Sequence, residues 1–295
     1  MATSFAARLR APILAAFAAL ATMTSASAGE PDGAPPEPVE PQTIGVFGDS
    51  LADGLWAGLN GAFRRDDRVA SVERLSEVST GLANWVYRDI AEKTEIQLSE
   101  RGYDIAVVMF GSNDMQGIRD ANGGVHRFRS ESWEAVYRDR IDQILAQLID
   151  HGATVYWVGL PVMRSDRYDA NVRYLNSLFE EHAEAAGAVY VSTRAVTEGA
   201  DGGYAAYLPD ARGVDRLMRA DDGIHFTLPG YRRLAGPVVE AIEYGWANPP
   251  EPAAEARDGE FEMLNVLQME IGGELWICRR PEDDPFAALG EPAGR

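Results

Sequence analysis

The chain has 295 residues, a length that allows one large domain or two small ones. Hydrophobic residues make up 46% and charged residues 25%; these globular values exclude wholesale disorder, a collagen-like structure and a polytopic membrane protein. Asp and Glu number 46 against 27 Lys and Arg, which gives a formal net charge of −19. Because so acidic a surface repels phosphate backbones, we expect no nucleic-acid partner.

The N-terminal segment has the pattern of a secretory signal peptide. Two arginines, Arg8 and Arg10, precede an uncharged apolar run at 11–21 and then Ala-Ser-Ala at 26–28. The apolar run is shorter than the about 20 residues that span a bilayer. We therefore expect residues 1–28 to be cleaved after Ala28, which predicts a periplasmic or secreted protein with no integral membrane span in the mature chain. The alternative is an uncleaved membrane anchor.

Proline-rich stretches mark the limits of the expected folded domain. Residues 29–41 contain five prolines without apolar periodicity, which indicates an extended linker. The folded domain is expected at 42–248. Residues 249–295 form a C-terminal extension that begins with a second proline-rich stretch. Strand-like stretches around 272–273 indicate a hairpin in this extension, followed by a disordered tail.

Strand and helix patterns alternate through the body of the chain. Apolar runs predict strands at 43–48, 71–79, 104–111, 154–159 and 188–191. Apolar spacings of three and four, together with glycine and proline signals, predict helices at 133–151, 168–186 and 229–244. This alternation predicts a parallel sheet with helices on both faces, in which ligands bind beyond the carboxyl ends of the strands.

Three residues that follow predicted strands could face such a crevice. Ser50 follows the first strand, and its N–H near a helix start suits a developing oxyanion; alternatively it is a helix N-cap. Asn113 follows the third strand and either aims its amide at the same crevice or occupies a turn. Gly81 follows the second strand, where its N–H can approach a ligand without a side chain in the way, or where it simply begins a turn.

A late segment supplies a base and a carboxylate. Neutral imidazole can activate a serine hydroxyl, and His225 stands just before the last predicted helix. A carboxylate on the other ring nitrogen fixes the tautomer and the orientation of the ring. Asp222 is three residues before His225, so one turn can hold both side chains together. Asp221 is the competing candidate, and the spacing favours Asp222.

These segments resemble the sequence blocks of SGNH hydrolases, also called GDSL esterases. The four blocks stand here in order as FGDSL at 47–51, Gly81, GSND at 111–114 and DGIH at 222–225. The segment GLPVMR at 159–164 is similar to an exported bacterial subgroup of that family whose substrates are poorly defined. The resemblance covers about residues 43–244, and four blocks in order are far more specific than any one of them.

The resemblance implies a fold and a set of roles. The fold would be a flavodoxin-like three-layer α/β/α sandwich with a five-stranded parallel sheet. Ser50 would be the nucleophile, His225 the general base and Asp222 its orienting partner. The oxyanion hole would be formed by the N–H groups of Ser50 and Gly81 and by the side chain of Asn113.

Further residues are weaker candidates for substrate binding. Arg164 follows the fourth strand and could contact a substrate carboxylate or glycan, or form a salt bridge. Tyr204 and Tyr207 lie in a glycine-rich segment that either walls the substrate cleft or is a structural loop. One cysteine, Cys278, cannot form a cysteine-based zinc site, and no histidines stand at metal-ligand spacing, so we expect no metal and no organic cofactor.

The sequence thus favours an exported serine esterase. Its expected substrates are short acyl esters, acetyl above all, on cell-envelope glycans or small molecules, cleaved through an acyl-enzyme. One alternative is an O-acyltransferase that uses the same residues. Another is a catalytically inactive envelope module that binds a glycan. The sequence gives no indication of the oligomeric state.

Overall fold

The structure of the protein is a computed structural model. It describes residues 40–85, 88–120, 122–210, 212–249, 267–271 and 274–278. The predicted signal peptide at 1–28, the linker up to residue 39 and most of the C-terminal extension lie outside the described residues. Cleavage after Ala28 therefore stays a prediction.

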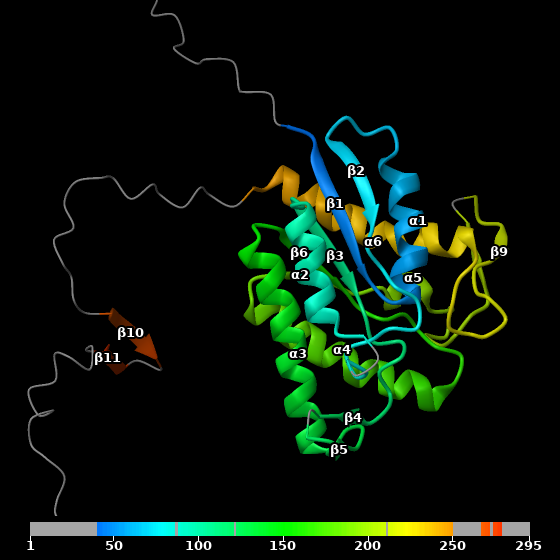
Figure 1. Cartoon of the computed structure of the whole chain (residues 1–295). Coiled ribbons are helices and arrows are strands. Elements are labelled where there is room, and N and C mark those ends of the chain that lie inside the picture. The colour runs from blue at the N-terminus through cyan, green and yellow to red at the C-terminus, as the bar shows by residue number, and fades with distance from the viewer. Residues whose placement is uncertain are drawn as a thin grey trace, which may run out of the picture. The chain divides into compact units, whose positions relative to one another are not determined.

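Five parallel strands form one sheet, as the sequence predicts (Figure 1). From one edge to the other they are β2 (Val69–Arg74), β1 (Gln42–Gly48), β3 (Ile105–Met109), β6 (Thr154–Val158) and β7 (Val189–Val191). The chain moves from β1 outward to one edge and then crosses back to β3, so the strand order reverses between β1 and β3. At such a reversal a crevice opens beyond the carboxyl ends of the two strands, and ligands bind there.

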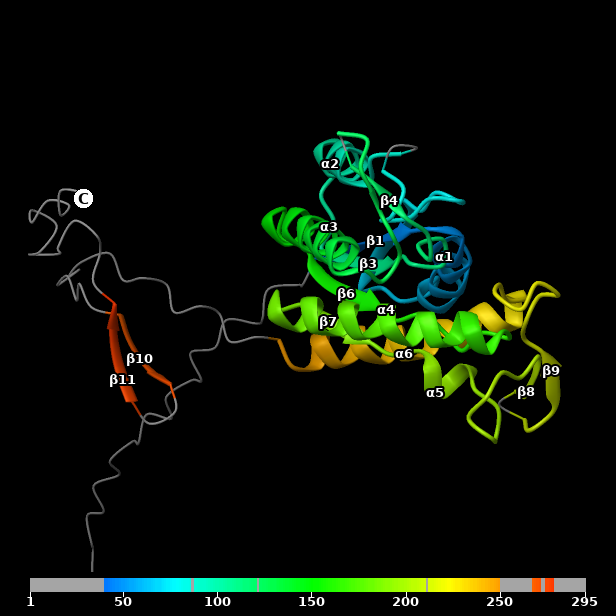
Figure 2. The ribbon, with the colours of Figure 1, turned by 90° about the horizontal axis from the view of Figure 1, so that it is seen from below.

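Helices cover both faces of this sheet (Figure 2). On one face α1 (Ser50–Phe63) packs against α6 (Leu228–Ala247). On the other face lie α2 (Ile90–Glu100), α3 (Glu131–Asp150) and α4 (Asp166–Ala185), each packed against the next. The resulting three-layer α/β/α sandwich is the architecture that the resemblance to SGNH hydrolases implied.

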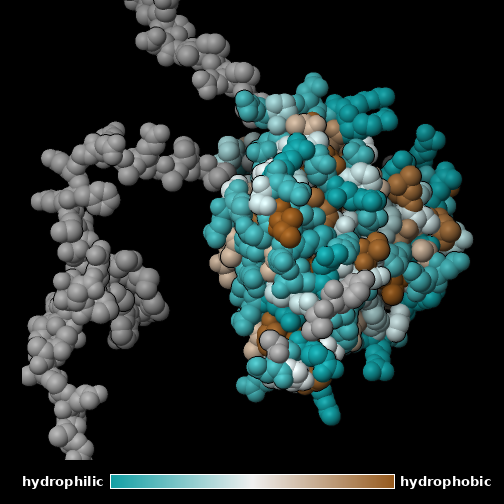
Figure 3. Space-filling view, in the orientation of Figure 1, coloured by the Kyte–Doolittle hydropathy of each residue, from teal (hydrophilic) through white to brown (hydrophobic). Residues whose placement is uncertain are grey.

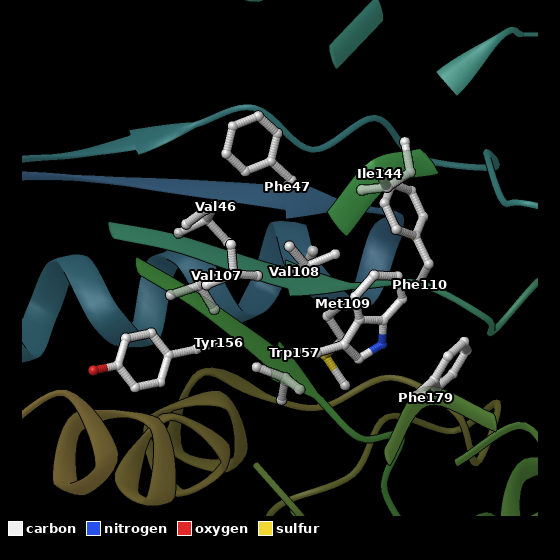
Figure 4. Packing of buried hydrophobic residues seen from close by; sticks show 14 of the residues in the cluster. Val46, Phe47, Val107, Val108, Met109, Phe110, Ile144, Tyr156, Trp157 and Phe179 are labelled. Atoms are coloured by element: carbon white, nitrogen blue, oxygen red, sulfur yellow. The ribbon is translucent and has the colours of Figure 1, made fainter. Parts of the chain in front are cut away.

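Side chains alternate along the central strands and enter the two helical layers (Figure 4). In register across β1, β3 and β6, one set is Val46, Val107 and Tyr156, and the other is Phe47, Val108 and Trp157. Trp157 packs against Phe179 of α4, with ring centroids 5.2 Å apart. Because both faces of the sheet are covered, the strands read as continuous apolar runs rather than as alternating ones.

Local capping signals set the helix ends. The hydroxyl of Ser130 accepts the N–H of Trp133 at 3.2 Å, so α3 begins two residues before the apolar periodicity does. Thr227 caps α6 in the same way, and Pro229 occupies the first turn of that helix.

Several short elements are not evident from the sequence pattern. The second strand ends at Arg74, and the rest of the predicted 71–79 segment forms a loop. Two small antiparallel hairpins, β4 (Ile118–Arg119) with β5 (Val125–His126) and β8 (Tyr207–Pro209) with β9 (Asp215–Leu217), and the four-residue α5 (Arg194–Thr197) are too short to show a hydrophobic period. In the C-terminal extension β10 (Leu267–Ile271) pairs antiparallel with β11 (Glu274–Cys278).

The face of the described chain seen in Figure 3 is largely hydrophilic, with scattered hydrophobic residues. This agrees with the excess of acidic residues in the sequence. The described part of the chain has no helix that is long and apolar enough to cross a membrane.

The packing of Trp157 generates a stability prediction. Its side chain is fully buried, so Trp157→Ala should lower the free energy of unfolding by about 3–5 kcal/mol through lost contacts and a residual cavity. Its indole N–H has no hydrogen-bond partner among the described residues. Trp157→Phe should therefore cost much less, because it keeps most of the packing and removes an unpaired donor. Urea unfolding of both variants tests this, and equal losses would contradict it.

Candidate active site

A sharp turn at the end of β1 presents Ser50. Gly48 has a φ of 145°, and a Cβ on it would lie 2.0 Å from the carbonyl oxygen of Met109, so only glycine fits there. Asp49 then caps α1 by accepting the N–H of Leu51 at 2.9 Å. Ser50 is the first residue of α1, so its N–H belongs to the positive end of the helix, where negative charge is stabilised.

Three predicted side chains form a continuous hydrogen-bonded series. Ser50 Oγ lies 2.7 Å from His225 Nε2, although the two residues are 175 positions apart. His225 Nδ1 lies 2.6 Å from Asp222 Oδ2. Because an ionised carboxylate can only accept, Nδ1 carries the proton in this pair. Nε2 is then the acceptor that faces the serine hydroxyl.

The Asp222 carboxylate is well suited to stay ionised. Partial burial raises its pKa, but hydrogen bonds from the His225 ring and from the N–H groups of Ile224 and His225 outweigh burial and bring the pKa to about 2. The two N–H groups reach Oδ1 at 2.8 and 2.9 Å. Asp221, the competing candidate, instead offers its backbone carbonyl to Arg164 Nη1 at 2.7 Å.

Gly81 lies in a segment that is held by hydrogen bonds to the buried carboxylate of Asp114. Asp114 accepts the N–H groups of Leu82 and Ala83 at 3.0 and 2.9 Å and the hydroxyl of Tyr137 at 2.8 Å. A Cβ on Gly81 would lie only 2.1 Å from Asp114 Oδ1. Glycine is therefore required here by close approach. Burial raises the pKa of Asp114, and its donors oppose that rise.

The side chain of Asn113 is tied to the same segment. Its Nδ2 donates to the carbonyl of Thr80 at 2.8 Å, and Thr80 directly precedes Gly81. A carboxamide nitrogen has two hydrogens, so a second donor remains on Asn113. The neighbouring Ser112 donates its N–H and its hydroxyl to Asp49 Oδ2, at 3.1 and 2.7 Å. Asp49 thus joins the Ser50 turn to the loop that carries Asn113.

The three weaker candidates have different surroundings. Arg164 lines a cavity of about 190 Å³ beside Asp222, whose other lining residues are Met163, Ser165, Tyr168, Gly223 and Ile224. Tyr204 lies against Arg219, whose guanidinium carbon is 4.9 Å from the centroid of the Tyr204 ring. Tyr207 is 60% exposed on β8, opposite Leu217 of β9. The structure thus brings only Arg164 to the cavity beside Asp222.

Several residues that build the site were not predicted from the sequence. Asp49 and Asp114 stand inside the recognised blocks, and for Asp49 a carboxylate directly after a buried strand was a usable signal. Tyr168 lines the cavity and donates its hydroxyl to the carbonyl of Ser112, and Arg219 lies beneath the 220–226 loop. Neither had a sequence signal, because their contacts depend on tertiary packing.

The described residues contain no cluster of three or more His, Cys, Asp or Glu side chains arranged to hold a metal ion. The groups that the site brings together are a hydroxyl, an imidazole and a carboxylate, with the Asn113 amide nearby.

Comparisons with known proteins give a family and a fold. Residues 43–241 match the family described as "Protein of unknown function (DUF459)". No curated protein matches the sequence.

Solved structures with similar folds include three hydrolases. An acetyl-xylooligosaccharide esterase from Geobacillus is 17% identical, with 70% of this chain and 97% of that chain covered and a TM-score of 0.51. An α/β hydrolase from the metagenome of Lake Arreo is 18% identical, covering 68% of this chain and 95% of that chain, with a TM-score of 0.51. A GDSL-like lipase from Bacteroides thetaiotaomicron is 14% identical. The match covers 69% of this chain and 89% of that chain, with a TM-score of 0.46.

The buried Asp49 carboxyl generates a prediction about pH. Burial raises its pKa to about 6, against opposing hydrogen bonds from Ser112 and Leu51, and the nearby Asp114 adds to the rise. The carboxyl binds its proton more tightly in the folded chain than in the unfolded chain, where the pKa is 3.8. Its contribution to stability is therefore complete below pH 3.8 and is lost as the pH rises through about 6.

The expected loss for Asp49 is about 3 kcal/mol in the free energy of unfolding between about pH 4 and pH 7. Asp49→Asn cannot titrate, so this part of the pH dependence should be missing from urea unfolding of that variant. Ser112→Ala removes a hydrogen bond that favours the ionised form and should move the midpoint to higher pH. A difference between wild type and Asp49→Asn that stays constant from pH 4 to pH 7 would show the assignment to be wrong.

Proposed function

This chain belongs to the DUF459 family, an SGNH-like family of unknown function, and we propose that it is a serine esterase that cleaves short acyl esters. The observation that carries this proposal is the series from Ser50 Oγ through His225 to Asp222, with separations of 2.7 and 2.6 Å. A hydroxyl, an imidazole and a carboxylate in this order are the parts that activate a nucleophilic serine.

In the proposed acylation step, Ser50 Oγ attacks the ester carbonyl carbon while its proton moves to His225 Nε2. Asp222 stabilises the imidazolium that forms and keeps the ring oriented. The carbonyl oxygen becomes an oxyanion, which accepts hydrogen bonds from the Ser50 and Gly81 N–H groups and from Asn113 Nδ2. The bond to the leaving alcohol then breaks, and the alcohol oxygen takes the proton from His225.

In the proposed deacylation step, water repeats the attack on the Ser50 acyl-enzyme. His225 Nε2 accepts a proton from the water and then returns it to Ser50 Oγ as the carboxylic acid leaves. The side chains of His225 and Asp222 are 36% and 47% exposed, so solvent reaches the base. This exposure favours water over a carbohydrate hydroxyl as acceptor, and therefore supports hydrolysis rather than acyl transfer.

The proposed substrate is a small ester on a polar molecule. The cavity beside Asp222, about 190 Å³, is smaller than the about 300–1,000 Å³ of drug-sized ligand pockets. Arg164 contributes a guanidinium to its lining, which suits hydroxyl or carboxylate oxygens. The signal-peptide pattern of residues 1–28 suggests export, and acetylated envelope glycans are then accessible substrates. The fold shared with an acetyl-xylooligosaccharide esterase makes acetylated oligosaccharides the first substrates to test.

The esterase proposal predicts that activity depends on Ser50. Purified wild type should hydrolyse p-nitrophenyl acetate, and Ser50→Ala should lower kcat by about 10³-fold or more because no nucleophile remains. Ser177→Ala, an exposed serine on α4, is the matched control and should retain full activity. An organophosphonate should label wild type stoichiometrically but not Ser50→Ala. Equal, slow turnover by wild type and Ser50→Ala, without labelling, would favour a non-catalytic binding module.

The proposed oxyanion contact predicts a separate effect for Asn113. Asn113→Ala should lower kcat by about 10²–10³-fold with a smaller change in KM, because the missing donor acts mainly on the transition state. Steady-state kinetics with p-nitrophenyl acetate measures both constants. Asn122→Ala, an exposed residue in the turn between β4 and β5, serves as control. If Asn113→Ala raised KM and left kcat unchanged, Asn113 would contribute to substrate binding rather than to the oxyanion.

A further inference from the structure

Arg219 is a buried arginine that the proposed chemistry does not use. It stands between β9 and the segment that carries Asp222 and His225, and only 1% of its surface is exposed. In the described part of the chain, none of its hydrogen bonds goes to a carboxylate. Burial lowers its pKa to about 10, so the guanidinium remains charged at neutral pH. A buried cation without a carboxylate partner needs another structural explanation.

Backbone carbonyls take the place of the carboxylate. The guanidinium donates to the carbonyl oxygens of Val162 (2.5 Å), Ile224 (2.9 Å), Gly223 (3.2 Å) and His225 (3.4 Å). Three of these carbonyls are consecutive in the 220–226 loop, and the fourth belongs to the loop after β6. The rigid, planar set of donors on arginine can hold several acceptors at once, which lysine cannot reproduce.

Two aromatic rings complete the surroundings of this cation. The guanidinium carbon lies 4.0 Å from the ring centroid of Phe226 and 4.9 Å from that of Tyr204. Such contacts stabilise a desolvated cation. Tyr204 therefore has a defined role in packing against Arg219, in addition to its position in the glycine-rich segment.

The geometry of the loop follows from these contacts. The N–H of Ala220 donates to the carbonyl of His225 at 2.9 Å and closes the base of the loop. Carbonyls 223–225 converge on the guanidinium, whereas the side chains of Asp222 and His225 meet each other and His225 reaches Ser50. A change in the curvature of this loop would therefore change the distance between His225 Nε2 and Ser50 Oγ.

We propose that Arg219 is a positioning residue that sets the approach of His225 to Ser50 by holding the carbonyls of residues 223–225. This inference rests on the proposed esterase function, in which that approach matters. Arg219 acts through the loop and through its link to Val162, and it contacts neither the substrate nor the reacting atoms.

Two substitutions and one matched control test this role. Arg219→Met removes all donors but keeps an apolar side chain of similar length, and Arg219→Lys keeps the charge with fewer, less rigid donors. Arg233→Met is the control, because Arg233 also donates to two carbonyls, those of Val196 and Pro209, away from the 220–226 loop. All variants are made in the full chain, and thermal unfolding gives the folded fraction of each.

The first readout is independent of activity. The proton between His225 Nδ1 and Asp222 should give a proton resonance downfield of the amide region, assigned by its loss in Asp222→Asn. We expect this resonance to disappear or shift in Arg219→Met, to be partly restored in Arg219→Lys and to be unchanged in Arg233→Met. An unchanged resonance in both Arg219 variants would overturn the proposal.

The second readout is kinetic. A misplacement of about 1 Å can lower a rate about 10²-fold, so we expect Arg219→Met to lower kcat and the rate of organophosphonate labelling of Ser50 by about that factor. KM should change much less, and Arg219→Lys should recover part of the loss. A decrease no greater than the unfolded fraction, or one equal to that of Arg233→Met, would show that Arg219 only stabilises the fold.

The two proposals fail in distinguishable ways. If wild type neither hydrolyses esters nor reacts with the organophosphonate, the esterase function is wrong, and the resonance alone then decides whether Arg219 sets the Asp222–His225 geometry. If wild type is active and Arg219→Met is equally active when folded, the esterase function stands and the positioning role is wrong.

Discussion

The carboxylate of Asp49 joins the ends of the two central strands, and the arrangement of the whole site depends on that link. It caps the helix that begins at Ser50 and also accepts both donors of Ser112 in the loop after β3. The two loops are therefore fixed relative to one another before any substrate arrives. Fixed donors of this kind need no reorganisation as charge develops, which is the main advantage that a folded site has over water.

The three carboxyl groups around the site occupy two different environments. Asp49 and Asp114 are both fully buried, and burial raises both pKa values, so each carboxyl is surrounded by hydrogen-bond donors. Asp222 is instead half-exposed with a pKa of about 2. The two kinds of environment separate carboxyls that hold loops in place from the one that can stabilise a cationic imidazole.

The sequence predicted site residues best where a candidate residue directly follows an apolar run that forms a strand. The apolar runs before Ser50 and Asn113 predicted buried parallel strands, and parallel strands bring their carboxyl ends together, so the approach of these residues could be expected. Arg219 could not be found in this way, because its acceptors are backbone carbonyls whose positions depend on the turns of two separate loops. The same holds for Tyr204, whose partner is Arg219 and whose position the sequence could describe only as a glycine-rich segment.

The start of β1 and the end of α6 lie together, since the indole N–H of Trp246 donates to the side-chain oxygen of Gln42 at 2.6 Å. Gln42 begins the strand whose opposite end leads to Ser50, so both flanking segments join the domain at the pole remote from the site. The described domain therefore begins and ends on the side opposite Ser50, and neither of these two ends narrows the crevice.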